Sequence, residues 1–302
     1  MNWEFERLYG PCEIPLTEGP VWDGGKLLFT HIRAGLILKY EPGTGSVDIW
    51  RSGTNQINGL AYDTNGALFG CCSGGRSIVK LAADGSAQTD VITSLDGRRL
   101  NTPNDLAIAR DGTIWFSDPW NPAGNLPDGE VEELGHMSVL SARPHEDGIY
   151  QVRRATFDTT KPNGVLLSAD ERTLYVAESH FERGRVRELR AYPILASGAL
   201  GDYETLFTWG EDDRGVHRGI DGMCLDEDGN ILACAGWAQA GSGPMIYVFS
   251  PEGRVLETHR VPAQMPTNLC FGGEDMCTLF VTSMQGHLFK VRTNRRGRLP
   301  HA

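Results

Sequence analysis

Residues 58–69 read Asn58-Gly-Leu-Ala-Tyr-Asp-Thr-Asn-Gly-Ala-Leu-Phe, which is a polar residue, a short apolar strand, a polar turn and a second apolar strand. The same pattern occurs six times in the 302-residue chain. The other copies begin at Glu18, Asn104, Asn163, Asp221 and Thr267. Units of short strands that recur about every 40 to 50 residues are typical of the blades of a β-propeller, and the two longer steps between copies hold insertions.

Further short strands lie between these copies, and Gly, Pro and Asp turns separate them. No long stretch has the periodicity of an amphipathic helix. The sequence therefore predicts an all-β fold, a six-bladed β-propeller that occupies residues 1–302 as a single domain. Because a ring of sheets has two loose ends, we expect residues 4–9 and 286–292 to pair as strands of one blade.

The composition excludes several classes of partner. A net charge of −11 argues against a nucleic-acid surface or an anionic membrane surface. The N-terminus lacks the basic start and apolar core of a secretory signal, and no apolar run is long enough to span a membrane. The seven cysteines have no framework spacing, which indicates a reducing compartment. We expect a cytoplasmic protein, whose oligomeric state is left open.

The first residue of each copy is expected to lie at the axis of the propeller, so that these residues converge on one point. Most of them carry side-chain oxygen atoms. They supply the carboxylates of Glu18 and Asp221, the amides of Asn58, Asn104 and Asn163, and the hydroxyl of Thr267. Hard oxygen ligands favour Ca²⁺ or Mg²⁺, with Mn²⁺ or Zn²⁺ still possible. For any single anchor, the alternative is that Asn or Asp before Gly is a turn residue that tolerates the left-handed conformation.

Longer motifs around these residues resemble the SMP-30/gluconolactonase/regucalcin-like family over nearly the whole chain. The motifs are Glu18-Gly-Pro-Val-Trp, Pro103-Asn-Asp-Leu, Asp111-Gly-Thr-Ile-Trp-Phe-Ser-Asp-Pro, Lys161-Pro-Asn-Gly-Val, Leu174-Tyr-Val-Ala-Glu-Ser and Gly219-Ile-Asp-Gly-Met. The Pro-Asn-Asp and Phe-Ser-Asp-Pro elements are similar to the bacterial and plant gluconolactonase branch. The resemblance implies a propeller with one axial divalent cation, Ca²⁺ above all, that hydrolyses a sugar lactone or a related ester.

Carried over position by position, the resemblance implies that Glu18, Asn163 and Asp221 are metal ligands. It makes Asn104 a further ligand or a substrate contact, and Asp221 also the general base or nucleophile. Asn58 is expected to contact the substrate. The function expected is a metal-dependent lactonase in which the cation polarises the carbonyl of a small lactone, such as an aldonolactone, and Asp221 assists attack by water.

Three further residues are candidates for substrate binding. The animal-type branch of the family has an Arg two residues before the position of Asn104, where this chain has Thr102, so Arg98 or Arg99 is expected to reach into the site instead. His217 and Trp237 flank central strands and are expected at the pocket mouth. Residues 119–147 form an insertion, which is either a lid on the pocket or a disordered surface loop.

Other functions remain open at this point. The same metal site suits a phosphotriesterase-like hydrolase, because both reactions need a cation that faces an electrophilic centre. A non-catalytic propeller that binds calcium or a ligand is an alternative from a different class. A relative of strictosidine synthase would use the same propeller without the metal.

Overall fold

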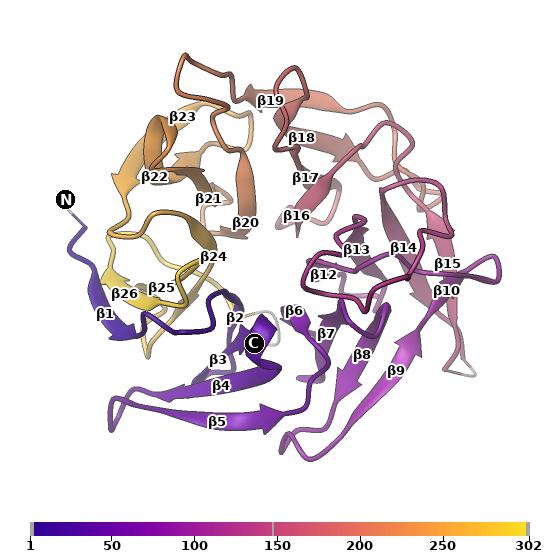
Figure 1. The fold of residues 1–302 in the computed structure, drawn as a ribbon, viewed down its shortest axis with the longest axis horizontal. Coiled ribbons are helices and arrows are strands. Elements are labelled where there is room, and N and C mark those ends of the chain that lie inside the picture. Colours follow the sequence, from indigo (N-terminus) through magenta and orange to yellow (C-terminus); the bar gives the residue numbers. More distant parts are fainter. Residues whose placement is uncertain (1–2, 147, 300–302) are drawn as a thin grey trace.

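The computed structural model describes residues 3–146 and 148–299, and it contains six four-stranded antiparallel sheets around a central axis (Figure 1). The predicted six-bladed β-propeller is therefore confirmed. The first three blades consist of β2(Thr17–Trp22), β3(Leu27–His31), β4(Leu36–Glu41), β5(Ser46–Ser52); β6(Ile57–Tyr62), β7(Leu68–Cys72), β8(Ser77–Leu81), β9(Gln88–Ile92); and β12(Leu106–Ile108), β13(Ile114–Asp118), β14(Ser138–Pro144), β15(Tyr150–Arg154).

The other three blades follow in chain order, and the last one takes its outer strand from the N-terminal segment. They consist of β16(Pro162–Leu167), β17(Thr173–Ser179), β18(Arg187–Pro193), β19(Glu204–Thr208); β20(Ile220–Leu225), β21(Ile231–Trp237), β22(Ala240–Phe249), β23(Val255–Arg260); and β24(Pro266–Gly272), β25(Thr278–Ser283), β26(Leu288–Arg292), β1(Glu6–Tyr9). A short hairpin, β10(Ser94–Leu95) and β11(Arg98–Arg99), and a 3₁₀ turn, η1(Ile32–Ala34), lie between blade strands. Within the described part of the chain, no helix is long and apolar enough to cross a lipid bilayer.

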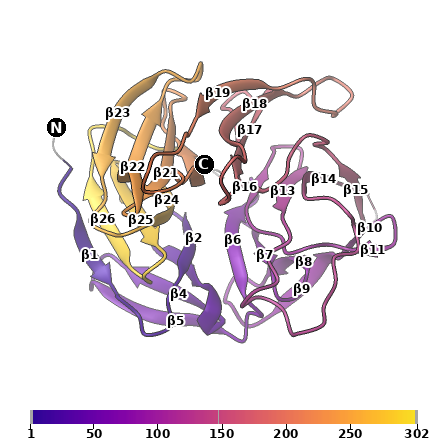
Figure 2. The same cartoon turned by 45° about the horizontal axis from the view of Figure 1, so that its top comes forward.

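The ring closes as the sequence predicts. Strand β1 pairs antiparallel with β26, with Arg7 opposite Phe289, and Lys290 forms an ion pair with Glu6 at 3.1 Å. Figures 1 and 2 both show the indigo β1 along the outer edge of the yellow β26. Main-chain pairing between the two ends of the chain thus joins the first and last parts of the ring in one blade.

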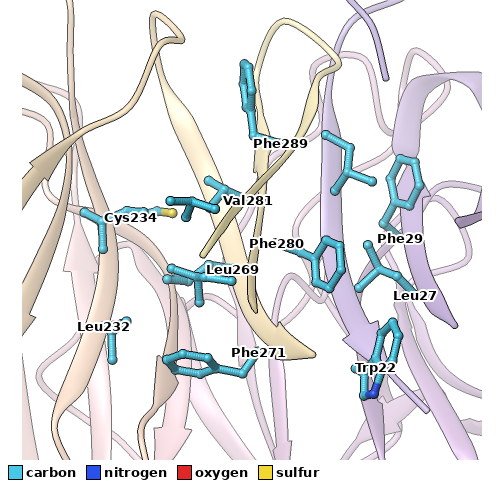
Figure 3. Packing of buried hydrophobic residues seen from close by; sticks show 14 of the residues in the cluster. Trp22, Leu27, Phe29, Leu232, Cys234, Leu269, Phe271, Phe280, Val281 and Phe289 are labelled. Atoms are coloured by element: carbon cyan, nitrogen blue, oxygen red, sulfur yellow. The ribbon is translucent and has the colours of Figure 1, made fainter. Parts of the chain in front are cut away.

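Buried side chains between blades join each sheet to its neighbours. The largest cluster fills the seam where the last blade meets the first (Figure 3). In this seam Phe280 of β25 stacks on Trp22 of β2, with ring centroids 5.7 Å apart, and lies 5.8 Å from Tyr40 of β4. Leu232 and Cys234 of β21 belong to the same cluster, so it spans three blades.

Replacing Phe280 with Ala is expected to lower the free energy of unfolding by about 3–5 kcal/mol, because its ring is 2% exposed and leaves a cavity between the first and last blades. Urea unfolding followed by circular dichroism measures this change. Phe157→Ala is the matched control, since its ring is 75% exposed and its loss should change stability by less than about 0.5 kcal/mol. Equal losses in the two variants would contradict a closing role for this seam.

The glycine that follows each of the anchors Asn58, Asn163 and Asp221 permits close packing of innermost strands around the axis. A Cβ atom on Gly59 would lie 2.9 Å from the carbonyl oxygen of Asn104, and one on Gly164 would lie 2.4 Å from the carbonyl oxygen of Asp221. Both contacts join one blade to the next. In the described chain neither these glycines nor the anchors Asn58, Asn104, Asn163 and Asp221 have a positive φ angle. The alternative reading of the Asn-Gly and Asp-Gly pairs as left-handed turns is therefore wrong.

Candidate active site

Five of the six anchors line one cavity of about 430 Å³, which we call the axial pocket. Four of them are the second residue of an innermost strand, and Asn104 lies two residues before β12. The anchors in the axial pocket are Glu18, Asn58, Asn104, Asn163 and Asp221. The pocket thus lies at the end of the channel where the innermost strands begin. Five separate blades contribute an oxygen-bearing side chain to it.

The three amide side chains in the axial pocket are available to a ligand. Asn58, Asn104 and Asn163 are half-buried, and among the described residues none of their side chains has a hydrogen-bond partner, whereas most buried polar groups in proteins are paired. Their carbonyl oxygens can accept a cation or a substrate hydroxyl without breaking an existing contact.

The carboxylates at the axis are crowded and buried. Burial raises the pKa of Glu18 well above its usual range, and the nearby charges of Asp221 and Asp105 raise it further, although hydrogen bonds from Gly19 and Asn268 act the other way. Burial likewise raises the pKa of Asp105 to about 7. Negative charge that is desolvated and mutually repelling is costly unless a positive charge compensates it.

Arg218 supplies part of that compensation. Its guanidinium is buried, and Nη2 donates a hydrogen bond to Oδ2 of Asp221 at 2.6 Å. Among the described residues, no other donor bonds to this carboxylate, so its Oδ1 is free to accept a proton or contact a cation. The ring of Phe181 lies over the guanidinium, 5.6 Å from its centre.

The residues present suit a divalent cation by their chemistry. Two carboxylates balance its charge, and three unpaired amides add neutral oxygen ligands. In the described ranges, no group of three or more His, Cys, Asp or Glu side chains gathers as a metal-binding cluster. A cation in the axial pocket would therefore depend on the amide oxygens, which is a donor set of Ca²⁺ or Mg²⁺ type rather than one for a thiolate-bound metal.

One wall of the axial pocket comes from the insertion in the third blade. Residues 119–137 join β13 to β14 without any strand, so the insertion is shorter than the predicted 119–147: residues 138–144 are β14, and Asp147 lies outside the described residues. Trp120 lines the pocket, and its carbonyl oxygen accepts a hydrogen bond from Nζ of Lys161 at 3.0 Å. The insertion is therefore packed into the site instead of forming a free surface loop.

Arg76 anchors this insertion to the second blade. Its side chain is fully buried, and it donates to the carbonyl oxygen of Leu100 at 2.6 Å and to Glu130 at 2.8 Å. Its guanidinium also lies over the Trp120 ring, 5.3 Å from the centroid. One buried cation thus connects the second blade, the insertion and the pocket wall.

An Arg76→Gln variant is expected to loosen the insertion, since the loss of these charge-assisted hydrogen bonds costs about 1–3 kcal/mol. Amide hydrogen exchange over residues 120–134 should then become about 10-fold to 100-fold faster. Arg99→Gln is a matched control because Arg99 also pairs with Glu130, but from a largely exposed position. Unchanged exchange in Arg76→Gln would contradict the anchoring role.

The sixth anchor departs from the prediction. Thr267 is buried, and its hydroxyl donates to the carbonyl oxygen of Thr17 and bonds to the hydroxyl of Thr282, so it joins the last blade to the first. The next residue, Asn268, stands where four of the other repeats have glycine, and its side chain lies against Gly222 of the neighbouring blade. It lines a second cavity of about 350 Å³ further along the channel, which also contains Asp105.

Three residues predicted to bind substrate do not line the axial pocket, which corrects that part of the prediction. The guanidinium of Arg99 is exposed and pairs with Glu130 at 3.0 Å. His217 lies 3.2 Å from Asp212, and Trp237 donates its indole N–H to the carbonyl oxygen of Val216. These contacts hold the loops themselves together. The hydroxyl of Thr102, where the animal-type branch has an Arg, donates to the carbonyl oxygen of Pro119 and so also holds the insertion.

Sequence reasoning missed two charged residues near the axis. Arg218 stands three positions before Asp221, and that spacing alone gave no reason to place it in the site. A signal for Asp105 was present, because Asn104-Asp-Leu aligns with Asn58-Gly-Leu and puts a carboxylate where the other repeats have glycine.

Comparisons with known proteins agree with this architecture. The sequence model described as "SMP-30/Gluconolactonase/LRE-like region" matches residues 16–285. The chain is 29% identical to a gluconolactonase from Zymomonas mobilis over 94% of this chain and 80% of that protein. It is 32% identical to a regucalcin from Danio rerio over 88% of this chain and 82% of that protein. A solved gluconolactonase from Xanthomonas campestris is 28% identical, with a TM-score of 0.78 over 96% of this chain and 89% of that one.

Proposed function

The chain belongs to the SMP-30/gluconolactonase/LRE-like family, and on this premise we propose that it is a divalent-cation-dependent lactonase that opens a small cyclic ester such as an aldonolactone. The observation that carries the proposal is the convergence of oxygen-bearing side chains from five blades on one pocket. The gluconolactonases among its relatives support the substrate class.

In this proposal Glu18, Asn163 and Asp221 hold the cation, with Ca²⁺ the preferred ion. Asn104 is a further ligand or holds a substrate hydroxyl, and Asn58 contacts the substrate. When bound, the cation would polarise the lactone carbonyl and stabilise the oxyanion that develops on it.

In this proposal Asp221 acts first as the general base and then as the general acid. Its Oδ1 atom accepts a proton from the water that attacks the carbonyl carbon, while Arg218 holds Oδ2 and so fixes the plane of the carboxylate. The same oxygen then returns the proton to the ring oxygen as the ester C–O bond breaks. The net reaction adds one water molecule to the lactone and gives one hydroxy acid.

The axial pocket has aromatic walls. Trp120 and Phe181 line it, and both would present aromatic surface to a ring-shaped substrate. A cavity of about 430 Å³ is in the usual size range of small-molecule sites.

A hydrolysis panel tests the proposal. Aldonolactones, aromatic lactones and a phosphotriester are each offered to the protein with Ca²⁺, Mg²⁺, Mn²⁺ or Zn²⁺, and acid release is followed with a pH indicator. Cation-dependent opening of an aldonolactone is the expected result. Hydrolysis of the phosphotriester alone would favour the phosphotriesterase alternative, and no hydrolysis at all would favour a binding propeller.

A further inference from the structure

Positive charge gathers in the axial pocket although the protein as a whole is acidic. The chain has a net charge of −11, yet three cationic side chains, Arg33, Lys161 and Arg218, line this one cavity together with two carboxylates. A divalent cation held by Glu18 and Asp221 would offset both of those carboxylates. Positive charge would then exceed negative charge in the pocket, although Arg218 stays bonded to Asp221.

Some hydrogen-bond donors of the Arg218 guanidinium have no partner within the described residues. Only Nη2 is paired, with Asp221, while its buried Nε and Nη1 have no hydrogen-bond partner among the described residues. Buried donors without partners are uncommon in folded proteins, and Arg218 lines the axial pocket, where a ligand can supply the missing acceptor. A planar guanidinium matches the oxygens of a carboxylate or a phosphate.

Lys161 and Arg33 extend this positive side toward the pocket mouth. Among the residues that the structure describes, the ammonium of Lys161 has one hydrogen bond, to the carbonyl oxygen of Trp120, whereas an ammonium carries three donors. Arg33 is exposed on η1 and lies against Gly124 of the insertion. In the described chain neither side chain forms an ion pair with a carboxylate, so both charges are free to act on a ligand.

We infer that the axial pocket selects lactones that carry a negatively charged group away from the ester, with Lys161, Arg33 and Arg218 as the residues that recognise this group. The inference rests on the proposed lactonase function and narrows its substrate class. The ester is attacked at the floor of the pocket beside Asp221, while the anionic group lies against the basic side chains.

The test compares substrates that share one ring. Glucono-1,5-lactone is neutral, the corresponding lactone with a carboxylate at C6 is a monoanion, and the C6 phosphate ester carries more charge. We expect kcat/KM to be about tenfold higher for an anionic lactone than for the neutral one at low ionic strength, and the preference to shrink as salt is added. Comparing kcat/KM for the carboxylate and the phosphate lactone shows which anion the pocket prefers.

Variants assign the preference to residues. In Lys161→Met and in Arg33→Gln the ratio of kcat/KM for anionic over neutral lactone is expected to fall about fivefold. These two positions are chosen because neither bonds to a proposed cation ligand. Arg110→Gln is the control for loss of one positive charge, since Arg110 is exposed and pairs with Glu171 outside the axial pocket; its ratio should not change.

Failure of the inference is distinguishable from failure of the proposed function. If neutral and anionic lactones are opened equally well, or if the ratio is the same in Lys161→Met and wild type, the anion site is refuted while the lactonase stands. If no lactone is opened, calorimetry with the open-chain C6 dicarboxylate still tests the site. Binding that weakens in Lys161→Met but not in Arg110→Gln supports it, and absence of binding overturns it.

Discussion

A protein in which Asn replaces Asp221 is expected to hydrolyse an aldonolactone at least about 10²-fold more slowly than the wild type, even at saturating cation. Asparagine keeps the shape of the side chain and one oxygen that can contact a cation. It cannot take a proton from water at neutral pH, so the acid–base step is lost. The measurement is kcat over a range of cation concentrations, which separates weaker cation binding from slower chemistry.

Loss of the Asp221 carboxylate also leaves the buried guanidinium of Arg218 without its acidic partner, which costs about 3–5 kcal/mol of stability in typical buried pairs. The double variant Arg218→Met/Asp221→Asn removes both charges and keeps the test independent of this loss. Asp105→Asn is the matched control, because Asp105 is a buried carboxylate near the axis that lines the second cavity. Turnover of Asp221→Asn within about threefold of wild type would rule out Asp221 as the general base.

The repeat pattern predicted the fold well because it reports a local property. Each copy places a polar residue, an apolar strand and a turn at fixed spacing, and that spacing is what puts Asn58, Asn163 and Asp221 at the same place in three different blades. Ring closure followed from the two strand-like segments at the ends of the chain. Neither inference required knowledge of contacts between distant side chains.

Residues whose partners come from other loops could not be placed in this way. Arg99 lies near the insertion, but its direction is decided by Glu130, and Trp237 is turned by the carbonyl oxygen of Val216. Thr267 shows a subtler failure: it is the second residue of its innermost strand, as four other anchors are, but its hydroxyl bonds to Thr17 and Thr282 instead of lining the axial pocket. Pattern alignment cannot detect which partner such a side chain takes.

Removal of divalent cations with excess chelator is expected to abolish lactone hydrolysis, and Glu18→Gln should weaken cation binding by at least about tenfold, because it removes one of two carboxylates that balance the charge. In the cation-free protein, Glu18→Gln should leave the free energy of unfolding unchanged or raise it. The carboxylate of Glu18 is buried beside Asp221 and Asp105, so its loss relieves repulsion between negative charges.

The pH dependence follows from the raised pKa of Glu18. The cation-free folded protein binds more protons than the unfolded chain above pH 4.5, the ordinary value for Glu, so this contribution to stability is present at low pH and is lost as pH rises through the folded value. A cation must displace the same proton, so its affinity should rise with pH. Thermal unfolding at pH 5 and pH 8, with and without Ca²⁺, measures both effects.

Asp118→Asn is the control for the cation experiment. Burial raises the pKa of Asp118 to about 8, but the carboxylate accepts a hydrogen bond from the backbone of Asn101 and does not line the axial pocket. Cation at 100 times its dissociation constant should stabilise wild type and Asp118→Asn alike by about 2.7 kcal/mol. At that same concentration Glu18→Gln should gain at least about 1 kcal/mol less. Two outcomes would contradict a catalytic cation held by the axial oxygens. In one, cation stabilises Glu18→Gln as much as wild type, so Glu18 does not balance the charge of the cation. In the other, the chelated protein keeps full turnover, so the reaction needs no cation.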